Sequence, residues 1–301
     1  MEDSEVITLL KKYGHLDMPF GNTAITPPEA EITGLTIDSA FVANAIASYQ
    51  AFHQVALSPL IAAFYPQRSS ARVRANGIAD TATKALMQMP RCECKDYAYA
   101  ESEPLLGSGS WKSCNSIGDF HCATVRFTTQ VPSFLTPIID EIWSRVVQAY
   151  AELGLLFKRD DNAQSANIDI SFVQPDSNWI GLAIVGGVES CGSSIWARFD
   201  RNYKPTNLVS EWTTLIKHEL GHNCGLQHSQ GGVMNPYIVA GLPISWSGDP
   251  SHALLTRRFG GVPIPSTPNE SKLVIARKYS DGRYQDVLDL PAADGGNWFN
   301  R

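Results

Sequence analysis

Three histidines fall within eleven residues, in the run HELGHNCGLQH at 218–228. His218 and His222 are four residues apart, so on a helix their rings lie on one face, one turn apart. Gly225 follows three residues later, and a glycine can adopt the left-handed backbone angles that turn a chain sharply. Such a turn brings His228 back towards the first two rings. The spacing therefore predicts a single site built from three imidazoles.

Three neutral imidazoles and one open position are the arrangement of a catalytic zinc site. Glu219 directly follows His218, so its carboxylate can lie beside the metal without binding it and can deprotonate a bound water. The whole chain has only seven histidines, which makes a surface helix with three incidental ones at these offsets a poor explanation. We expect one zinc ion held by His218, His222 and His228, with Glu219 as the general base.

The complete motif, H-E-x-x-H-x-x-G-x-x-H, resembles the signature of the metzincin metalloproteases. Ser229 after the last histidine and the run GGVMNP at 231–236 are similar to the matrix metalloproteinase (matrixin) branch of that family. The resemblance implies a methionine turn at Met234 beneath the metal. It also implies that Pro236 and Tyr237 form the wall of a substrate pocket, although the family tyrosine usually stands one position away. The similarity extends over about residues 110–262 and weakens away from the metal motif.

The pattern of apolar residues predicts the order of the secondary structure. Helices are expected at 5–14, 36–57, 80–90 (with Asp80 as N-cap), 135–156, 207–226 and 251–260, and strands at 121–129, 167–173, 181–187 and 194–200. The resemblance implies an α+β fold, in which a helical-bundle prodomain precedes a metzincin catalytic domain. That domain has a twisted, mostly parallel sheet with one antiparallel edge strand, a long active-site helix, the methionine turn and a C-terminal helix. A substrate peptide is expected to lie extended along the edge strand at Gly181, Leu182 and Ala183.

Composition divides the chain into four parts. Residues 1–96 form the expected helical prodomain, which resembles the matrixin propeptide and the related peptidoglycan-binding-like domain. Residues 97–118 are rich in glycine and serine and predict an exposed, cleavable activation linker. Residues 119–262 form the expected catalytic domain, and residues 263–301 form a weakly patterned tail.

A second motif, MPRCECKDY at 89–97, resembles the P-R-C-G-x-P-D sequence of latent matrixins. The resemblance implies that Cys92 occupies the fourth zinc position as a thiolate, a good zinc ligand, and excludes water. Arg91 and Asp96 can pair to hold this loop. Glu93 and Lys95 depart from the family sequence, and Glu93 is expected to add a negative charge beside Glu219. Cys94 remains an alternative ligand, and a structural disulfide or an unbound loop thiol remains an alternative role for Cys92.

Other positions bear on further metals. Ile184, Val185 and Arg198 stand where matrixins carry histidines for a structural zinc, so no second zinc is expected. Asp200 matches a calcium ligand of the family, but Tyr203 replaces its acidic partner, which leaves calcium binding or a capping role open. His15, His53, His121 and His252 are isolated in the sequence and are expected in core or surface positions. Cys114 and Cys122 flank a short loop and can form a disulfide.

Charge and hydropathy exclude some classes of function. The net charge of −6 and the pI of about 5.6 give no basic surface for a nucleic acid. No apolar run reaches the roughly 18 residues needed for a membrane span. The start of the chain lacks the pattern of a secretory signal, and the family resemblance nevertheless implies a secreted, extracellular location.

The predicted function is that of a zinc-dependent endopeptidase, made as a thiol-blocked zymogen. It acts as a monomer on an extended protein or peptide substrate. The alternative is a cell-wall glycan-binding protein, in which the N-terminal helices bind peptidoglycan and the metal domain is accessory or permanently inhibited.

Overall fold

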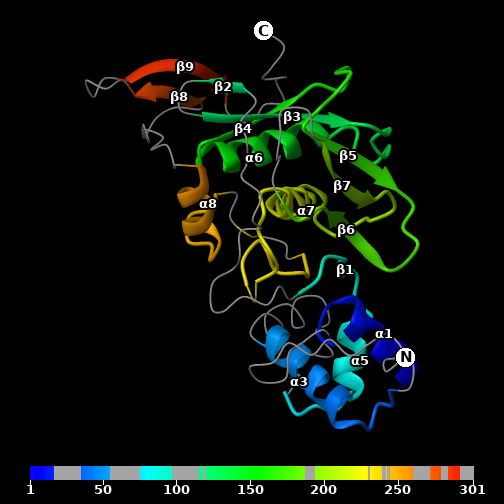
Figure 1. The fold of residues 1–301 in the computed structure, drawn as a ribbon. Helices are drawn as coiled ribbons and strands as arrows, with labels where there is room; N and C mark the ends of the chain where they lie inside the picture. The colour runs from blue at the N-terminus through cyan, green and yellow to red at the C-terminus, as the bar shows by residue number, and fades with distance from the viewer. Residues whose placement is uncertain are drawn as a thin grey trace.

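The computed structural model places a group of helices from the N-terminal part beside a sheet-containing part formed by the rest of the chain (Figure 1). The structure describes residues 1–16, 35–54, 75–96, 115–117, 120–186, 194–229, 231–238, 242, 245–259, 272–278 and 284–291. Within these ranges, none of the helices is both long enough and apolar enough to span a bilayer.

Among the described residues of the N-terminal part, the helices are α1 (Asp3–Lys12), α3 (Ala40–Gln54) and α5 (Thr81–Met87). The side chain of Asp80 caps α5 by accepting a hydrogen bond from the backbone N–H of Thr83. The apolar faces of the three helices pack on one another, and we call this group the N-terminal helical cluster. Its buried members are Val6, Leu10, Tyr13, Leu16, Val42, Ala45, Ile46, Tyr49, Leu86, Met87 and Tyr237. Helices are present in the ranges predicted at 5–14, 36–57 and 80–90, but α1 ends at Lys12, α3 begins at Ala40 and α5 ends at Met87, and residues 55–57 lie outside the described residues.

A seven-stranded sheet dominates the rest of the chain. Its order is β1-β6-β7-β5-β3-β2, and β4 also pairs with β3. The strands are β1 (Arg91–Cys92), β2 (Asn115–Ile117), β3 (Phe120–Phe127), β4 (Leu155–Arg159), β5 (Ile168–Val173), β6 (Trp179–Ala183) and β7 (Ile195–Asp200). Side chains of β5 alternate between buried and half-buried, as expected for a strand with one face in a core.

The direction of β6 sets it apart from the central strands. The pairs β3–β4, β3–β5 and β5–β7 are parallel, whereas β6 runs antiparallel to β7. A short antiparallel pair, β2–β3, lies at the other end of the sheet. The mostly parallel sheet with an antiparallel strand near its edge is therefore confirmed. The segment β1 adds to β6 in parallel, with Cys92 aligned with Gly181, so the N-terminal part covers this edge.

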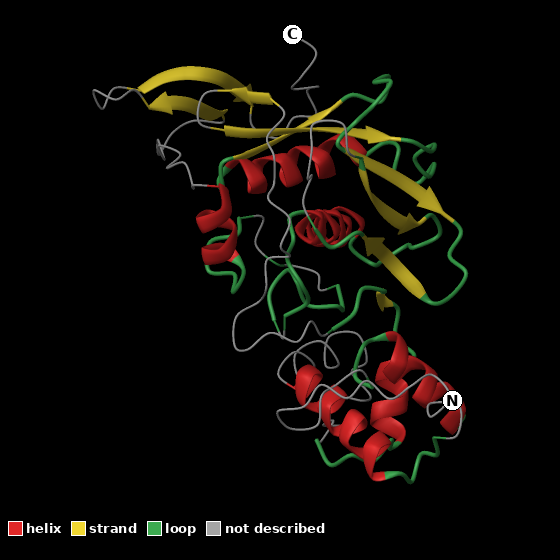
Figure 2. Cartoon of the chain, viewed as in Figure 1, coloured by secondary structure: helices red, strands yellow, loops and turns green. Residues whose placement is uncertain are grey.

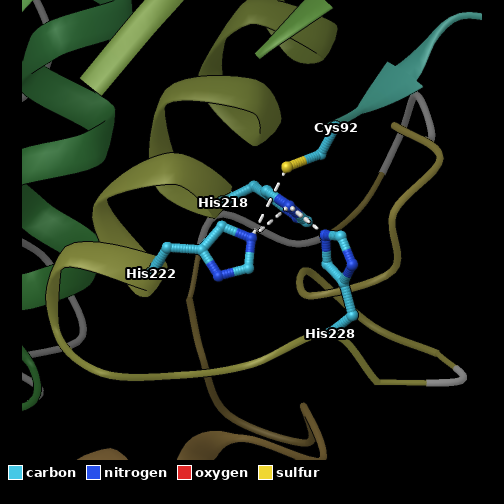
Figure 3. Close-up of side chains that lie close together, drawn as sticks. All are labelled: Cys92, His218, His222 and His228. Carbon is cyan, nitrogen blue, oxygen red and sulfur yellow. Dashed lines mark hydrogen bonds between the residues drawn. The ribbon is translucent and has the colours of Figure 1, made fainter. Parts of the chain in front are cut away.

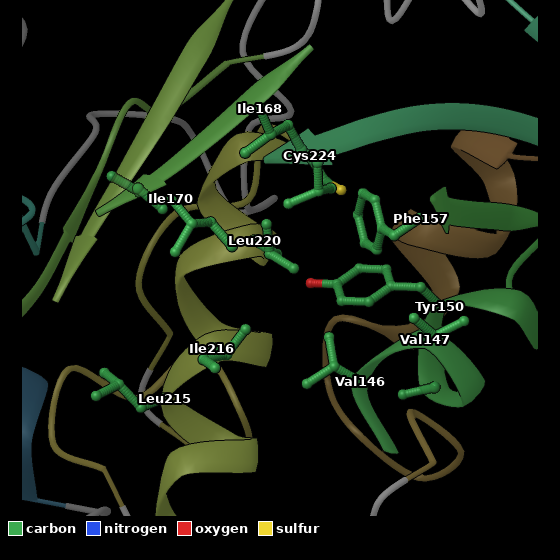
Figure 4. Close-up of a cluster of buried hydrophobic side chains, with 14 of the residues drawn as sticks. Val146, Val147, Tyr150, Phe157, Ile168, Ile170, Leu215, Ile216, Leu220 and Cys224 are labelled. Carbon is green, nitrogen blue, oxygen red and sulfur yellow. The ribbon is translucent and has the colours of Figure 1, made fainter. Parts of the chain in front are cut away.

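Two helices, α6 (Ile139–Ala151) and α7 (Leu208–Asn223), lie on one face of the sheet (Figure 2). A third helix, α8 (His252–Phe259), follows near the end of this part. The hydroxyl of Tyr150 on α6 donates a 2.7 Å hydrogen bond to the carbonyl of Lys217 on α7. Residues of both helices and of the sheet form the main core, which includes Val146, Val147, Phe157, Ile168, Ile170, Leu215, Ile216, Leu220 and Cys224 (Figure 4). This core fixes α7 beneath the sheet.

Several predicted boundaries are wrong. The helix expected at 135–156 ends at Ala151, because Gly154 turns the chain with φ of 88° and the next residues form β4. The edge strand expected at 181–187 begins earlier and is shorter, spanning Trp179–Ala183. Strand β2 lies within the expected linker. A hairpin of β8 (Lys272–Lys278) and β9 (Tyr284–Pro291) lies in the tail that showed no clear pattern.

Candidate metal centre

Helix α7 carries two of the three histidines and then ends in a tight turn. Gly225 has φ of 91°, a conformation that favours glycine. Its N–H donates to the carbonyl of His222 at 2.8 Å, and the N–H of Leu226 donates to the carbonyl of Gly221 at 3.0 Å. This pair of bonds is the Schellman motif, which ends a helix and reverses the chain. The turn brings His228 back to the helix, as the sequence predicted.

The Nε2 atoms of the three imidazole rings point towards one place (Figure 3). Nε2 of His218 lies 3.1 Å from Nε2 of His222 and 3.3 Å from Nε2 of His228. All three side chains are buried. The structure thus brings together residues that are up to ten positions apart in the sequence.

The other ring nitrogens fix how these rings are protonated. Nδ1 of His218 lies 2.7 Å from the carbonyl of Val233, and Nδ1 of His222 lies 2.8 Å from the carbonyl of Leu226. A carbonyl only accepts, so each Nδ1 carries a proton and, in the neutral ring, Nε2 presents a lone pair. Lone pairs that face one another at about 3 Å repel unless a cation lies between them, and either a proton or a metal ion can be that cation.

Cys92 approaches the rings from β1, so that the four side chains surround one point (Figure 3). Its Sγ lies 3.6 Å from Nε2 of His222, and the four donor atoms all lie within 4.8 Å of one another. Zinc bond lengths in a tetrahedral site place two nitrogens about 3.3 Å apart and a nitrogen and a sulfur about 3.6 Å apart. The spacing and the soft donor set therefore both fit zinc.

Cys94, the alternative ligand, lies to one side of this point. Its Sγ donates to the carbonyl of Ala183 at 3.4 Å, and its backbone N–H points to Sγ of Cys92 at 3.4 Å. It groups with Cys92, Glu219 and His222 but not with all three histidines. The geometry favours Cys92 over Cys94 as the fourth donor.

Glu219 directs an unpaired carboxylate at the same place. It is fully buried, and neither oxygen has a hydrogen-bond partner among the described residues. Burial raises the pKa of Glu219 well above its usual value, and the nearby Cys94 raises it further. One of its oxygens lies within 4.8 Å of Sγ of Cys92 and of a ring nitrogen of His222. A buried carboxylate without a partner, next to the metal position, is suited to receive a proton.

The rings respond differently to these surroundings. Burial and the neighbouring rings lower the pKa of His218, and burial lowers that of His228 to about 4 although Asp96 opposes this effect. Burial also disfavours the charged form of His222, but Cys94 and Glu219 outweigh it and raise the pKa to about 9. The centre therefore attracts one positive charge, which a proton on His222 or a metal ion can supply.

Met234 lies beneath the helix that carries the histidines. It is fully buried, and a Cβ added at Gly221 would lie 2.6 Å from its Sδ. The carbonyl of Met234 accepts a 2.9 Å hydrogen bond from the N–H of Ser229, which closes the turn. This position agrees with the expected methionine turn, and its role remains a prediction.

Tyr237 lies against the N-terminal part. Its hydroxyl is 2.7 Å from that of Tyr49 on α3 and donates to the carbonyl of Leu86 at 3.1 Å. The guanidinium of Arg91 lies 5.3 Å from the centre of its ring. Tyr237 is therefore part of the N-terminal helical cluster, and its expected place in a substrate pocket remains a prediction. Pro236 next to it accepts a 2.9 Å hydrogen bond from the N–H of Cys92.

The carboxylate of Asp96 is surrounded by hydrogen-bond donors that the sequence did not predict. It pairs with Arg91, as expected, and also lies 3.1 Å from Nε2 of His15, 3.2 Å from Nε2 of His53 and 3.0 Å from Nδ1 of His228. All five side chains are buried. Burial alone would raise the pKa of Asp96, but Arg91 and the histidines lower it well below its usual value. His15 and His53 are buried, in line with the expected core positions, and the fold also brings both to one carboxylate, which their separate places in the sequence did not predict.

Glu93 does not lie where the sequence suggested. Its carboxylate forms an ion pair with Lys12 of α1 and accepts a 3.2 Å hydrogen bond from the hydroxyl of Ser177. Alternate residues of an extended segment point to opposite sides, so Cys92 faces the histidines and Glu93 faces away. The expected negative charge beside Glu219 is therefore wrong.

The remaining metal prediction concerned Asp200. Its carboxylate accepts a 2.8 Å hydrogen bond from the N–H of Asn202, as in an Asx turn, and the hydroxyl of Tyr203 donates to Glu211 at 3.1 Å. Among the described residues, no group of acidic side chains gathers around Asp200, so nothing supports calcium there. Cys114, the expected disulfide partner of Cys122, lies outside the described residues.

Comparison with known proteins finds a similar sequence and a similar structure. No protein-family model matches the chain. The interstitial collagenase of Oryctolagus cuniculus is 26% identical over 188 residues, which cover 56% of this chain and 37% of the collagenase. The chain thus spans little more than a third of the length of this curated relative. The solved structure of myroilysin aligns with a TM-score of 0.30 and 14% identity, over 41% of this chain and 53% of that one.

Proposed function

We propose that this chain is a zinc-dependent endopeptidase whose own N-terminal part keeps it inactive. The convergence of Cys92 with His218, His222 and His228 carries this proposal, because their four donor atoms lie within 4.8 Å of one another, close enough to bind a single zinc ion. The sequence similarity to a protein named as a collagenase supports proteolysis as the reaction.

His218, His222 and His228 would hold the zinc ion, and Glu219 would transfer the proton. When bound, zinc polarises a substrate carbonyl and lowers the pKa of a water molecule at its open position. Glu219 takes a proton from the water that attacks the peptide carbonyl and passes it to the nitrogen of the leaving amine.

The edge of β6 supplies the binding surface for an extended peptide. In this structure that edge is paired with β1, and the N–H of Glu93 donates to the carbonyl of Gly181 at 3.0 Å. The N–H of Cys92 donates instead to the carbonyl of Pro236, outside β6. We infer that a substrate backbone takes the same edge at Gly181, Leu182 and Ala183 once the N-terminal segment has left. Pro236 and Tyr237 then border the pocket for one substrate side chain.

Residues 91–96 block the site in two ways. The thiol of Cys92 takes the position that water needs, and the backbone of β1 takes the edge that a substrate needs. Both are released together when this segment moves away. We therefore propose that activation requires displacement or cleavage of the N-terminal part.

The test combines metal analysis with proteolysis of an unfolded protein substrate. The purified full chain should contain about one zinc per molecule and should gain activity after treatment with a thiol-reactive mercurial. Glu219→Gln should keep its zinc but lose at least about 100-fold in activity, the usual scale for a general base. Absence of zinc, full activity of Glu219→Gln, or continued inactivity after mercurial treatment would each contradict the proposal.

A further inference from the structure

The three histidines differ in what supports their second ring nitrogen. Nδ1 of His218 and Nδ1 of His222 bond to carbonyls of nearby residues, Val233 and Leu226. Nδ1 of His228 instead faces Oδ1 of Asp96 at 3.0 Å, from a residue 132 positions earlier in the chain. Both side chains are completely buried. The orientation of the third ring therefore depends on the N-terminal part.

Asp96 is itself held firmly by that part. Its backbone N–H donates to the carbonyl of Tyr13 at 3.0 Å, just after the end of α1. Its carboxylate accepts from His15, which follows α1, and from His53 on α3. Arg91 adds a charged contact to both carboxylate oxygens. The carboxylate that contacts His228 is thus held in place by residues of two helical elements.

We propose that Asp96 is a positioning residue for the metal centre: the N-terminal helices supply the carboxylate behind the third histidine. A histidine that binds a metal commonly donates its other ring N–H to a carboxylate, which orients the ring and makes it a better ligand. Here that carboxylate departs with the N-terminal part. The chain consequently binds zinc more tightly while its helices are docked than after they have left, independently of the thiol of Cys92. This inference rests on the zinc site proposed above.

The coupling acts in both directions. If docking of the helices tightens zinc binding, zinc must tighten docking of the helices by the same factor. If the thiol of Cys92 alone linked zinc binding to docking of the helices, replacing Cys92 would abolish that coupling. If the bond between Asp96 and His228 contributes, part of the coupling remains after Cys92 is replaced.

The experiment uses the full chain with Cys92→Ser as the parent, so that the thiol cannot contribute. Zinc affinity is measured by competition with a chromophoric chelator. Adding Asp96→Asn should weaken zinc binding by about 10- to 100-fold, the range for loss of such a supporting carboxylate. Asp80→Asn is the matched control, since it changes a carboxylate of the same helical part that caps α5 and asparagine is an equally good cap. This control should leave the zinc affinity unchanged.

A second measurement needs no change at Asp96. In the zinc-loaded parent, NMR of the histidine ring protons should find the Nδ1 proton of His228 as protected from solvent exchange as those of His218 and His222. Rapid exchange of that proton, or equal zinc affinity with and without Asp96→Asn, overturns the role of Asp96 while zinc binding and proteolysis stand. Failure of every variant to bind zinc overturns the proposed function as well.

Discussion

The backbone of Gly181 on β6 lies directly against the carboxylate of Glu219 on α7. A Cβ added at Gly181 would overlap Oε1 of Glu219 and would lie 2.9 Å from Cδ1 of Leu215. The strand that we expect to bind a substrate and the carboxylate that we expect to move its proton are therefore in contact, with no room for a side chain between them.

Gly181→Ala should displace the carboxylate of Glu219 and lower kcat by about 100-fold, because small errors in placing a catalytic group have effects of that size. The zinc content should stay the same, since none of the three histidines is in the way. Gly231→Ala is the control, because a Cβ there meets nothing within 4 Å. Kinetics after mercurial activation, with zinc analysis of each variant, would check this. Unchanged kcat in Gly181→Ala would refute the close contact.

Cys92→Ser and Cys94→Ser should behave differently, although the two residues are almost adjacent. Only the sulfur of Cys92 groups with all three histidines. Cys92→Ser should therefore show, without mercurial, a measurable but minor part of the activity that mercurial releases in the unaltered chain, because β1 still covers the edge of β6. Cys94→Ser should stay inactive until treated, because its hydroxyl can still donate to the carbonyl of Ala183. Assays of the full-length variants before and after treatment give the answer, and spontaneous activity of Cys94→Ser alone would identify it as the blocking thiol.

Two tyrosine-to-phenylalanine changes should differ in their cost to stability. Tyr203 donates to the buried carboxylate of Glu211, whereas Tyr150 donates to the neutral carbonyl of Lys217. Hydrogen bonds to charged groups contribute about 1.5–3 kcal/mol and those to neutral groups about 1 kcal/mol. Tyr203→Phe should accordingly lower the free energy of unfolding more than Tyr150→Phe in urea titrations at pH 7. The reverse order would mean that water takes the place of the lost donor at Glu211.

The stability of the chain should depend on the ionisation of Asp96. Its pKa lies well below the usual value in the folded chain, although burial acts in the opposite direction, because Arg91 stabilises the charged form. A depressed folded pKa contributes stability that is present above the unfolded pKa of about 3.9 and is lost as the pH falls towards the folded value. The difference in unfolding free energy between the unaltered chain and Asp96→Asn should thus be constant from pH 7 to about pH 5 and shrink below pH 4. Urea titrations across this range test it, and a difference independent of pH would exclude the effect.

The site on α7 could be predicted because the residues that form it are close together in the sequence. His218 and His222 follow helical spacing, and Gly225 ends the helix where the turn is needed to return His228. The same holds for the N-cap at Asp80. Each of these features depends on residues within about one helical turn or one tight turn, which a single sequence displays directly.

What the sequence did not predict depends on distant contacts. His15 and His53 lie 81 and 43 positions from Asp96, and Tyr49 lies 188 positions from Tyr237. No spacing rule connects residues so far apart. The helix predicted at 135–156 includes Leu155 and Leu156 because these apolar residues continue the pattern of α6, and only pairing with β3 makes them part of strand β4.

Tyr237, which is far from the N-terminal helices in the sequence, is part of their apolar core. A single cut between residues 96 and 115 leaves that tyrosine in place, together with its contact to Arg91 and the ladder between β1 and β6. The two fragments would therefore remain one particle after proteolysis. The rate of their dissociation, rather than that of the cut, would then set how quickly activity appears.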